Sequence, residues 1–264
     1  MSQAIVLQDI CKSFGKTNAV INMNLTIPTG ALCGFLGPNG AGKSTTIRMI
    51  MSIIHADSGS IEVLGTTALQ AKDRIGYLPE ERGIYRKMKV GAYIQYIANL
   101  KGMHGASLKK TINDWLDRIE LPNVLQKKCE ELSKGMQQKV QFLASIIHDP
   151  ELIILDEPFT GLDPVNAKVI GKVIDELHND GRTILFSTHV LPQAEQICDR
   201  IVMIDQGIKV LDDAIGSIRD QFDPRMIQVE PVDSHADFSQ IAGISQSLPI
   251  DKSGKINLRL EDDA

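Results

Sequence analysis

A glycine-rich segment near the N-terminus carries the strongest chemical signal in the chain. It reads Gly37, Pro38, Asn39, Gly40, Ala41, Gly42, Lys43 and Ser44, and it matches the pattern G-x-x-x-x-G-K-[ST] in full. Glycines here let backbone N–H groups converge on phosphate oxygens without a side-chain clash. The pattern predicts a phosphate-binding loop, with Lys43 at the β- and γ-phosphates and Ser44 on Mg²⁺. The alternative is a chance glycine-rich turn.

Two adjacent acids, Asp156 and Glu157, end the apolar run Leu152–Leu155. Carboxylates at the end of a strand, beside a phosphate loop, are suited to holding Mg²⁺ and activating water. We expect Asp156 to hold the metal, directly or through a water molecule, and Glu157 to act as the general base. Taken alone, the same dipeptide is more often a solvated turn, so this interpretation depends on the phosphate loop.

The elements needed to position these residues are visible in the apolar pattern. The runs Ala4–Leu7, Leu25–Ile27 and Ala31–Leu36 predict strands, and helical spacing from Lys43 to His55 predicts a helix directly after the phosphate loop. The runs Leu152–Leu155 and Thr183–Ser187 are typical of strands buried on both faces of a parallel sheet. Between them we expect a helix that starts at Asp163-Pro164 and ends at Asp180-Gly181.

The middle and the end of the chain have a different character. From about Gly91 to His148 the pattern is mostly helical, which predicts a helical insertion in an α/β core. Beyond about Asp220, Met226–Val229 and Ile256–Leu260 alternate like strands, with turn signals at Pro224, Pro249 and 252–254. We therefore expect residues 1–220 to form the main domain, with a helical subdomain at about 86–148, and residues 221–264 a small β-containing appendage.

Composition narrows the class of protein. The formal net charge is −5, and the basic residues are scattered, so we expect no nucleic-acid partner. The four cysteines lie far apart without a C-x-x-C pair, which favours free thiols in a reducing cytosol. The first residues lack a basic segment followed by an apolar stretch, so no signal peptide is expected, and no apolar run approaches a membrane span.

Three further segments, in order along the chain, complete a family resemblance. Residues 132–139 resemble the ABC signature, Gly161-Leu162-Asp163 resembles the D-loop, and Ser187-Thr188-His189 resembles the switch-histidine segment. Together with the phosphate loop and the carboxylate pair, they make residues 4 to 210 similar to an ABC ATPase. The resemblance implies an α/β P-loop NTPase core of ABC type, in which a mixed sheet carries an N-terminal antiparallel β part.

The resemblance also implies the ligands and the roles of single residues. Two ATP molecules with Mg²⁺ would lie between two such domains paired head to tail. Each ATP would contact the phosphate loop and Thr45 of one subunit, and Ser133 and Gly135 of the other. His189 would contact the γ-phosphate, Asp163 would communicate across the dimer, and Phe14 would stack on adenine. Local structure offers alternatives: helix N-caps at Ser133 and Asp163, a structural histidine, and a core aromatic residue at position 14.

The sequence departs from the family pattern at two places. Glu80 stands after the segment Ile75–Leu78, where glutamine is usual. A carboxylate can ligate Mg²⁺, but it adds negative charge near the phosphates, and the alternatives are a solvated Glu80 or a pair with Arg82. Lys134 replaces a usual glycine of the signature and Met136 a usual glutamine. Lys134 would either attract a phosphate across the interface or be solvated, and we favour the second.

Residues 79–85, the altered signature and the appendage resemble ATPase subunits of bacterial ABC-2-type exporters. The appendage is shorter than is common in that group, so it is either incomplete or typical of a neighbouring subgroup. The resemblance implies an ATP-hydrolysing subunit that closes as a dimer against a separate integral membrane permease, on the inner face of the cell membrane. The alternatives are a non-transport ABC ATPase acting on a cytosolic complex, or a regulatory ATP-binding module without turnover.

Overall fold

The computed structural model describes residues 2–81, 83–221, 226–230, 241–247 and 255–261. The chain divides into two compact units, Met1–Ala214 and Ile215–Ala264. The predicted boundary between an ATPase domain and an appendage lies at residue 220, and it stays a prediction. Among the described residues, no helix combines the length and the apolar character needed to cross a bilayer.

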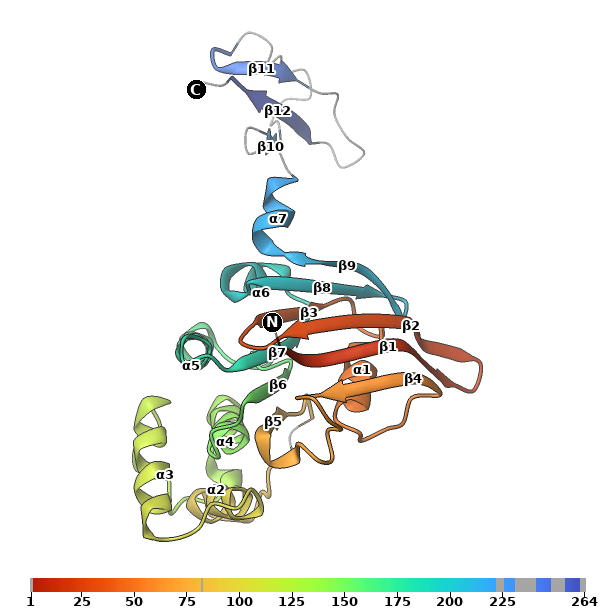
Figure 1. The fold of residues 1–264 in the computed structure, drawn as a ribbon. Coiled ribbons are helices and arrows are strands. Elements are labelled where there is room, and N and C mark those ends of the chain that lie inside the picture. Colours follow the sequence, from red (N-terminus) through yellow and green to blue (C-terminus); the bar gives the residue numbers. More distant parts are fainter. Residues whose placement is uncertain (1, 82, 222–225, 231–240, 248–254, 262–264) are drawn as a thin grey trace. The chain divides into compact units, whose positions relative to one another are not determined.

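The first unit is built around a mixed sheet (Figure 1). Its order is β5-β6-β7-β3-β8-β9, parallel from β5 to β8, with β9 antiparallel at one edge. The strands are β5 Ile75–Leu78, β6 Leu152–Asp156, β7 Thr183–Thr188, β3 Leu32–Leu36, β8 Arg200–Asp205 and β9 Ile208–Ala214. Every residue of β3, β6 and β7 is buried, as the continuous apolar runs predict.

A second, antiparallel sheet of order β2-β1-β4 forms the N-terminal part. Its strands are β1 Gln3–Phe14, β2 Thr17–Pro28 and β4 Ser58–Val63. The strands β1 and β2 are longer than the predicted runs Ala4–Leu7 and Leu25–Ile27. Their pairing continues to Phe14↔Thr17 at an exposed hairpin end, where polar residues carry no apolar signal. The predicted mixed sheet with an antiparallel part is therefore confirmed.

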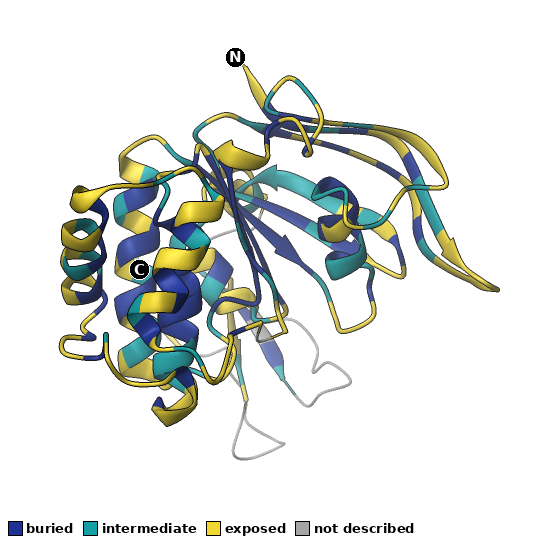
Figure 2. Ribbon diagram, turned by 90° about the horizontal axis from the view of Figure 1, so that it is seen from below, coloured by how far each residue is buried: buried dark blue, intermediate teal, exposed yellow. Residues whose placement is uncertain are grey.

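Helices lie on the faces of the main sheet and in the insertion. They are α1 Lys43–Ile50, α2 Val90–Leu100, α3 Ala106–Arg118, α4 Lys134–Ile146, α5 Pro164–Asn179 and α6 Leu191–Ile197, with 3₁₀ turns η1 Lys72–Arg74 and η2 Cys129–Glu131. Figure 2 shows the buried strands between helices whose inner sides are buried and outer sides exposed. The predicted insertion is thus the helical layer α2–α4.

The helix after the phosphate loop is shorter than the sequence pattern predicts. The prediction ran to His55, but α1 ends at Ile50. Ser52 has a φ of +55°, in the left-handed region, and this conformation turns the chain out of the helix. The prediction was wrong there because Met51 and Ile54 keep the helical spacing although they lie beyond the last residue of the helix, where they pack against the core.

The second unit contains α7 Ile215–Asp220 and a sheet of order β10-β12-β11. The strands β10 Met226–Val229 and β12 Ile256–Leu260 coincide with the predicted runs, and they pair antiparallel. The strand β11 Ile244–Ser247 was not predicted. The predicted turns at Pro224, Pro249 and 252–254 lie outside the described residues.

Candidate active site

The phosphate loop joins the end of the central strand β3 to the first residue of α1, as the motif requires. Gly42 has a φ of +107°, and a Cβ atom there would lie 2.4 Å from the Ala19 carbonyl oxygen, so only glycine fits. The Lys43 ammonium donates to the carbonyl oxygens of Gly37, at 2.7 Å, and of Pro38, at 3.1 Å. Its charge is thereby held over the loop, where an anion bound to the loop N–H groups would meet it.

The sheet brings distant segments to this loop. Strand β7 lies between β3 and β6, with Leu36 opposite Thr188 and Asp156 opposite Ser187. Because the strands are parallel, the residues that follow each of them meet at one edge of the sheet. The residues at and after the ends of β6 and β7 therefore lie beside the phosphate loop, although they are more than a hundred residues from it in sequence. Ser44 and Asp156 are one such pair.

Asp156 is almost fully buried next to the start of α1. The Ser44 hydroxyl lies 3.5 Å from its Oδ1, and the Ser187 hydroxyl also donates to Oδ1. Burial raises the pKa of Asp156, and the two hydroxyl hydrogen bonds act in the opposite direction. A buried carboxylate beside a hydroxyl is a hard oxygen donor set, and a divalent cation would offset the cost of its charge. These residues fit Mg²⁺.

Glu157 is held in an unusual conformation at the end of β6. Its φ is +53°, and its backbone N–H donates to the Ser187 carbonyl oxygen at 3.2 Å. Its side chain is about 9% exposed, with Oε1 2.8 Å from His189 Nδ1 and Oε2 accepting from the Thr160 hydroxyl at 3.2 Å. A left-handed residue other than glycine costs about 1–3 kcal/mol and persists only where its surroundings fix it. The carboxylate is thus fixed in place beside a half-exposed imidazole.

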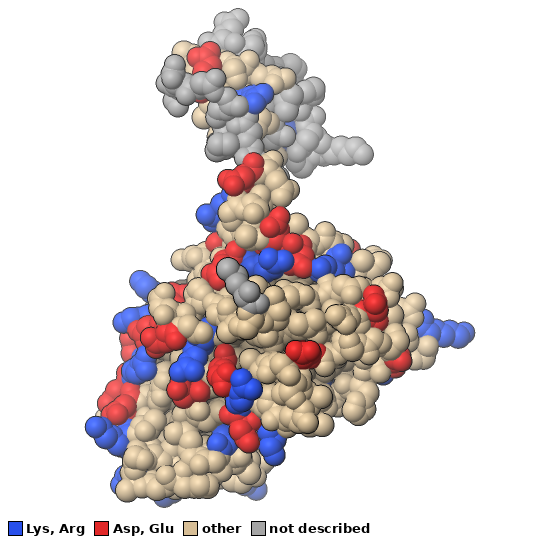
Figure 3. All heavy atoms as spheres, viewed as in Figure 1, with Lys and Arg blue, Asp and Glu red and all other residues tan. Residues whose placement is uncertain are grey.

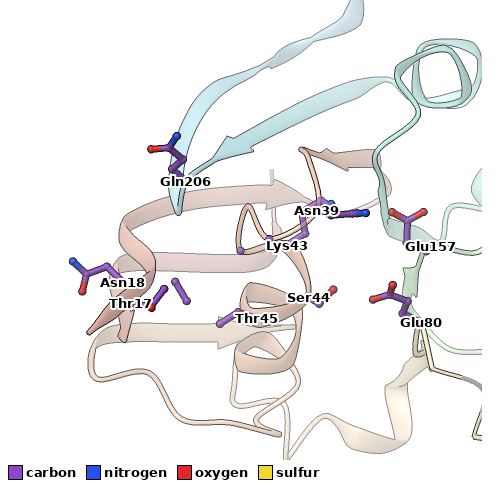
Figure 4. A pocket seen from close by; sticks show the side chains of 12 residues that line it. Thr17, Asn18, Asn39, Lys43, Ser44, Thr45, Glu80, Glu157 and Gln206 are labelled. Carbon is purple, nitrogen blue, oxygen red and sulfur yellow. The ribbon is translucent and has the colours of Figure 1, made fainter. Parts of the chain in front are cut away.

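A cavity of about 540 Å³ opens over these groups (Figure 4). Its lining includes the phosphate-loop residues Asn39, Gly40, Gly42, Lys43, Ser44 and Thr45, together with Glu80, Glu157, Thr17, Asn18, Ala19 and Gln206. In Figure 4, Glu80 and Glu157 lie at the same end of the cavity, near Ser44. Both an ammonium and carboxylates therefore face one hollow, as binding of an anion together with a metal cation requires.

Comparison with known proteins identifies the family. The family described as ABC transporter matches residues 20–160. The ABC transporter ATP-binding protein YhaQ of Bacillus subtilis, an uncharacterized protein by its name, is 38% identical over 259 residues, or 98% of this chain and 87% of that protein. The chain belongs to the ABC transporter family. It is an ATP-binding ATPase of the kind that serves transporters.

One further relative and one solved structure agree with this membership. Nod factor export ATP-binding protein I of Sinorhizobium fredii is 36% identical over 213 residues, or 79% of this chain and 62% of that protein. A solved ATP-binding subunit of an ABC transporter has a TM-score of 0.76 and 28% identity, and the match covers 83% of this chain and 92% of that chain. The resemblance to ABC ATPases, including exporter ATPases, is confirmed.

Within this ABC fold, Phe14 lies at the end of β1 and is 52% exposed. The alternative that it is a core residue is therefore wrong. The Lys12 ammonium lies 5.4 Å from the centre of its ring. Phe14 itself does not line the cavity over the phosphate loop, but Thr17, its partner across the hairpin, does. Stacking of Phe14 on adenine stays a prediction.

The signature and D-loop residues lie at helix starts. The Ser133 hydroxyl accepts from the Met136 N–H at 3.3 Å, and Asp163 Oδ1 accepts from the Asn166 N–H at 2.9 Å, which confirms both predicted N-caps. A Cβ atom on Gly135 would lie 3.4 Å from Asn166 Nδ2, so the starts of α4 and α5 pack together. Ser133, Gly135 and Asp163 do not line the cavity of their own chain, and their contact with a nucleotide stays a prediction.

The sequence interpretation missed several residues at the site. Thr160 and Ser187 contact the carboxylates of Glu157 and Asp156. A polar residue at the end of the buried run Thr183–Ser187 was a signal for the second of these. Three residues on the far side of the cavity, Thr17, Asn18 and Gln206, had no signal, because ordinary turn residues gain a role only from the folding of distant segments against them.

Proposed function

We propose that this chain binds and hydrolyses Mg-ATP as one of two paired ABC ATPase subunits that power an exporter through a separate membrane subunit. The observation that carries the proposal is that Lys43, Ser44 and Glu157 line one cavity, with Asp156 against Ser44 and His189 against Glu157. The Sinorhizobium relative is named as a Nod factor export protein, which supports that direction of transport.

The proposed roles follow from the geometry of each side chain. Lys43 binds the β- and γ-phosphates of ATP, together with backbone N–H groups of the phosphate loop. Ser44, Asp156 and Glu80 are the proposed metal ligands. When bound, Mg²⁺ supplies positive charge that stabilises the negative charge on the phosphate oxygens.

Hydrolysis needs a base beside the attacking water. Glu157 has one oxygen on His189 and the other on Thr160, so its carboxylate is oriented toward the cavity before any substrate arrives. We assign it as the general base, which takes the proton of the water that attacks the γ-phosphorus. His189 is proposed to position this carboxylate through its Nδ1 contact and, because its imidazole is half-exposed, to contact the γ-phosphate as well.

The site of one chain does not include its own Ser133 or Gly135. A head-to-tail pair supplies these residues from the second subunit, where the N-terminal end of α4 attracts the γ-phosphate. Dimer closure therefore completes the site. On the face shown in Figure 3, acidic and basic side chains are interspersed. We propose the membrane subunit as the further partner. That subunit would hold the protein on the inner face of the membrane.

Replacement of the proposed base tests this function. Glu157→Gln removes the proton acceptor but keeps the shape, so ATP should still bind while turnover falls by about 100-fold or more. Gel filtration with Mg-ATP should then show a species larger than the parent gives. Glu62→Gln, on the exposed side of β4, is the matched control and should leave both unchanged. Turnover of Glu157→Gln near that of the parent contradicts the assignment of the base.

A further inference from the structure

The cavity over the phosphate loop has two chemically different ends. Glu80 and Glu157 lie at one end with Ser44, whereas Thr17, Asn18 and Gln206 lie at the other (Figure 4). If the triphosphate of ATP occupies the loop, as the proposed function has it, the γ-phosphate points toward the carboxylates. The nucleoside then extends toward the end with Thr17, Asn18 and Gln206. The inference below rests on that proposed function.

Gln206 is fixed at this end by its backbone. It lies in the turn between β8 and β9, with a φ of +48°. The next residue, Gly207, donates its N–H to the Ala41 carbonyl oxygen at 2.9 Å and accepts from the Ile21 N–H at 2.8 Å. The turn is therefore bonded to the phosphate loop and to β2 at once. The Gln206 side chain is exposed, lines the cavity and has no hydrogen bond to any residue that the structure describes.

Asn18 contributes a second amide from the hairpin of β1 and β2. Its Oδ1 accepts from the Ser13 hydroxyl at 2.9 Å, and the Ser13 N–H donates to Asp57 at 2.7 Å. With its oxygen engaged in this way, the Asn18 side chain presents N–H donors to its surroundings. Two amides from different sheets thus line the same end of one cavity.

We propose that Gln206, with Asn18, hydrogen-bonds the edge of the nucleobase. A purine edge offers both donors and acceptors, and an amide matches such an edge with its own donor and acceptor. Because the Gln206 amide is free to rotate, it presents its oxygen or its nitrogen as the base demands. The contact therefore forms with adenine and guanine alike. It makes nucleoside triphosphates bind more tightly than the bare triphosphate chain.

The test compares three ligands on one variant. Dissociation constants for ATP, GTP and inorganic tripolyphosphate, each with Mg²⁺, are measured by calorimetry for the parent and for Gln206→Leu. We expect ATP and GTP to weaken by about fivefold, the effect of one lost hydrogen bond, and tripolyphosphate to bind as before. Asn18→Leu should give the same pattern. Gln3→Leu, an exposed glutamine at the start of β1, is the matched control and should change nothing.

Each other outcome overturns the inference. Equal weakening of all three ligands means that the turn acts on the phosphate loop and not on the base. Unchanged affinity for ATP in Gln206→Leu means that Gln206 does not contact the nucleoside. Failure of the parent protein to bind ATP at all would instead reject the proposed function, so the two failures are distinguishable.

Discussion

At the scale of single residues, the site depends on charges whose positions are fixed by a few hydrogen bonds. The Lys43 ammonium is bonded to two loop carbonyl oxygens, and the Glu157 carboxylate to His189 and Thr160. Glu80 differs from these, because it is exposed and has no such anchor among the described residues, although it lines the same cavity. Substitution of Glu80 can decide whether it ligates the metal or is solvated.

Lys43→Ala should weaken ATP binding about tenfold or more, because it removes a charge-assisted contact to the phosphates. The affinity is measured by titration with ATP, and thermal unfolding checks that the loop still folds. Lys110→Ala, an exposed lysine of α3, serves as the control. Equal ATP affinity in Lys43→Ala and the parent would reject the phosphate-loop assignment.

Two substitutions at Glu80 separate a metal ligand from a solvated side chain. Glu80→Gln keeps an oxygen ligand, so hydrolysis should survive, whereas Glu80→Ala should weaken the Mg²⁺ dependence and turnover together. Turnover against Mg²⁺ concentration is measured for both variants. Matching curves, both near that of the parent, would remove Glu80 from the active site. Arg82, the alternative partner of Glu80, lies outside the described residues.

At the scale of elements, the helical insertion is joined to the sheet where α4 crosses β5. A Cβ atom on Gly76 of β5 would lie 2.3 Å from the Ser145 carbonyl oxygen of α4, so the two backbones are in contact there. The Lys101 ammonium at the end of α2 also donates to the Ile75 carbonyl oxygen at 2.9 Å. Both contacts fix the insertion to the strand that leads to Glu80.

Gly76→Ala should destabilise the protein by about 1–3 kcal/mol, since the added methyl group meets a backbone oxygen that cannot move aside alone. Gly171→Ala is the matched control, because a Cβ atom there meets nothing within 4 Å in the middle of α5. The control should stabilise by up to about 1 kcal/mol through helix propensity. Thermal unfolding midpoints compare the two, and an unchanged midpoint in Gly76→Ala would contradict the close contact.

At the scale of the whole molecule, the first unit has a small hollow where the end of β5 meets the helical insertion. A cavity of about 190 Å³ lies between β5 and the helices α2 and α4, lined by residues including Tyr77, Gly83, Tyr93 and Gln141. The buried Gln141 Oε1 has no hydrogen-bond partner among the described residues. Tyr85 follows the lining residue Gly83 by two positions and is 52% exposed. Its ring packs edge-on against the ring of Tyr96. We propose this surface as the docking site of the membrane subunit.

Charge reversal at Arg86, the residue after Tyr85, tests the proposed docking. Arg86→Glu should reduce co-purification of the membrane subunit from solubilised membranes more than it reduces basal ATP turnover, because Arg86 lies outside the nucleotide cavity. Lys110→Glu, on α3 of the same insertion, is the control for a general charge effect. Undiminished recovery of the membrane subunit with Arg86→Glu would count against docking at this place.

The sequence by itself determined the parts of this protein that are encoded within a few residues. The loop from Gly37 to Ser44, the buried strand before Asp156, and the N-caps Ser133 and Asp163 all follow from local backbone and side-chain preferences. The α/β class with a helical insertion followed from the apolar pattern, whereas the mixed sheet of ABC type was implied by the family resemblance.

Only the tertiary structure decided what these parts contact. The strand order β6-β7-β3 places Ser44 against Asp156, 112 residues away, and Ser187 against both acids of the pair. Likewise, the exposure of Phe14, the end of α1 at Ile50 and the place of Gln206 in the cavity depend on which segments pack nearby. Local preference leaves such choices open, because the free energy that settles them comes from burial and hydrogen bonds between segments far apart in the chain.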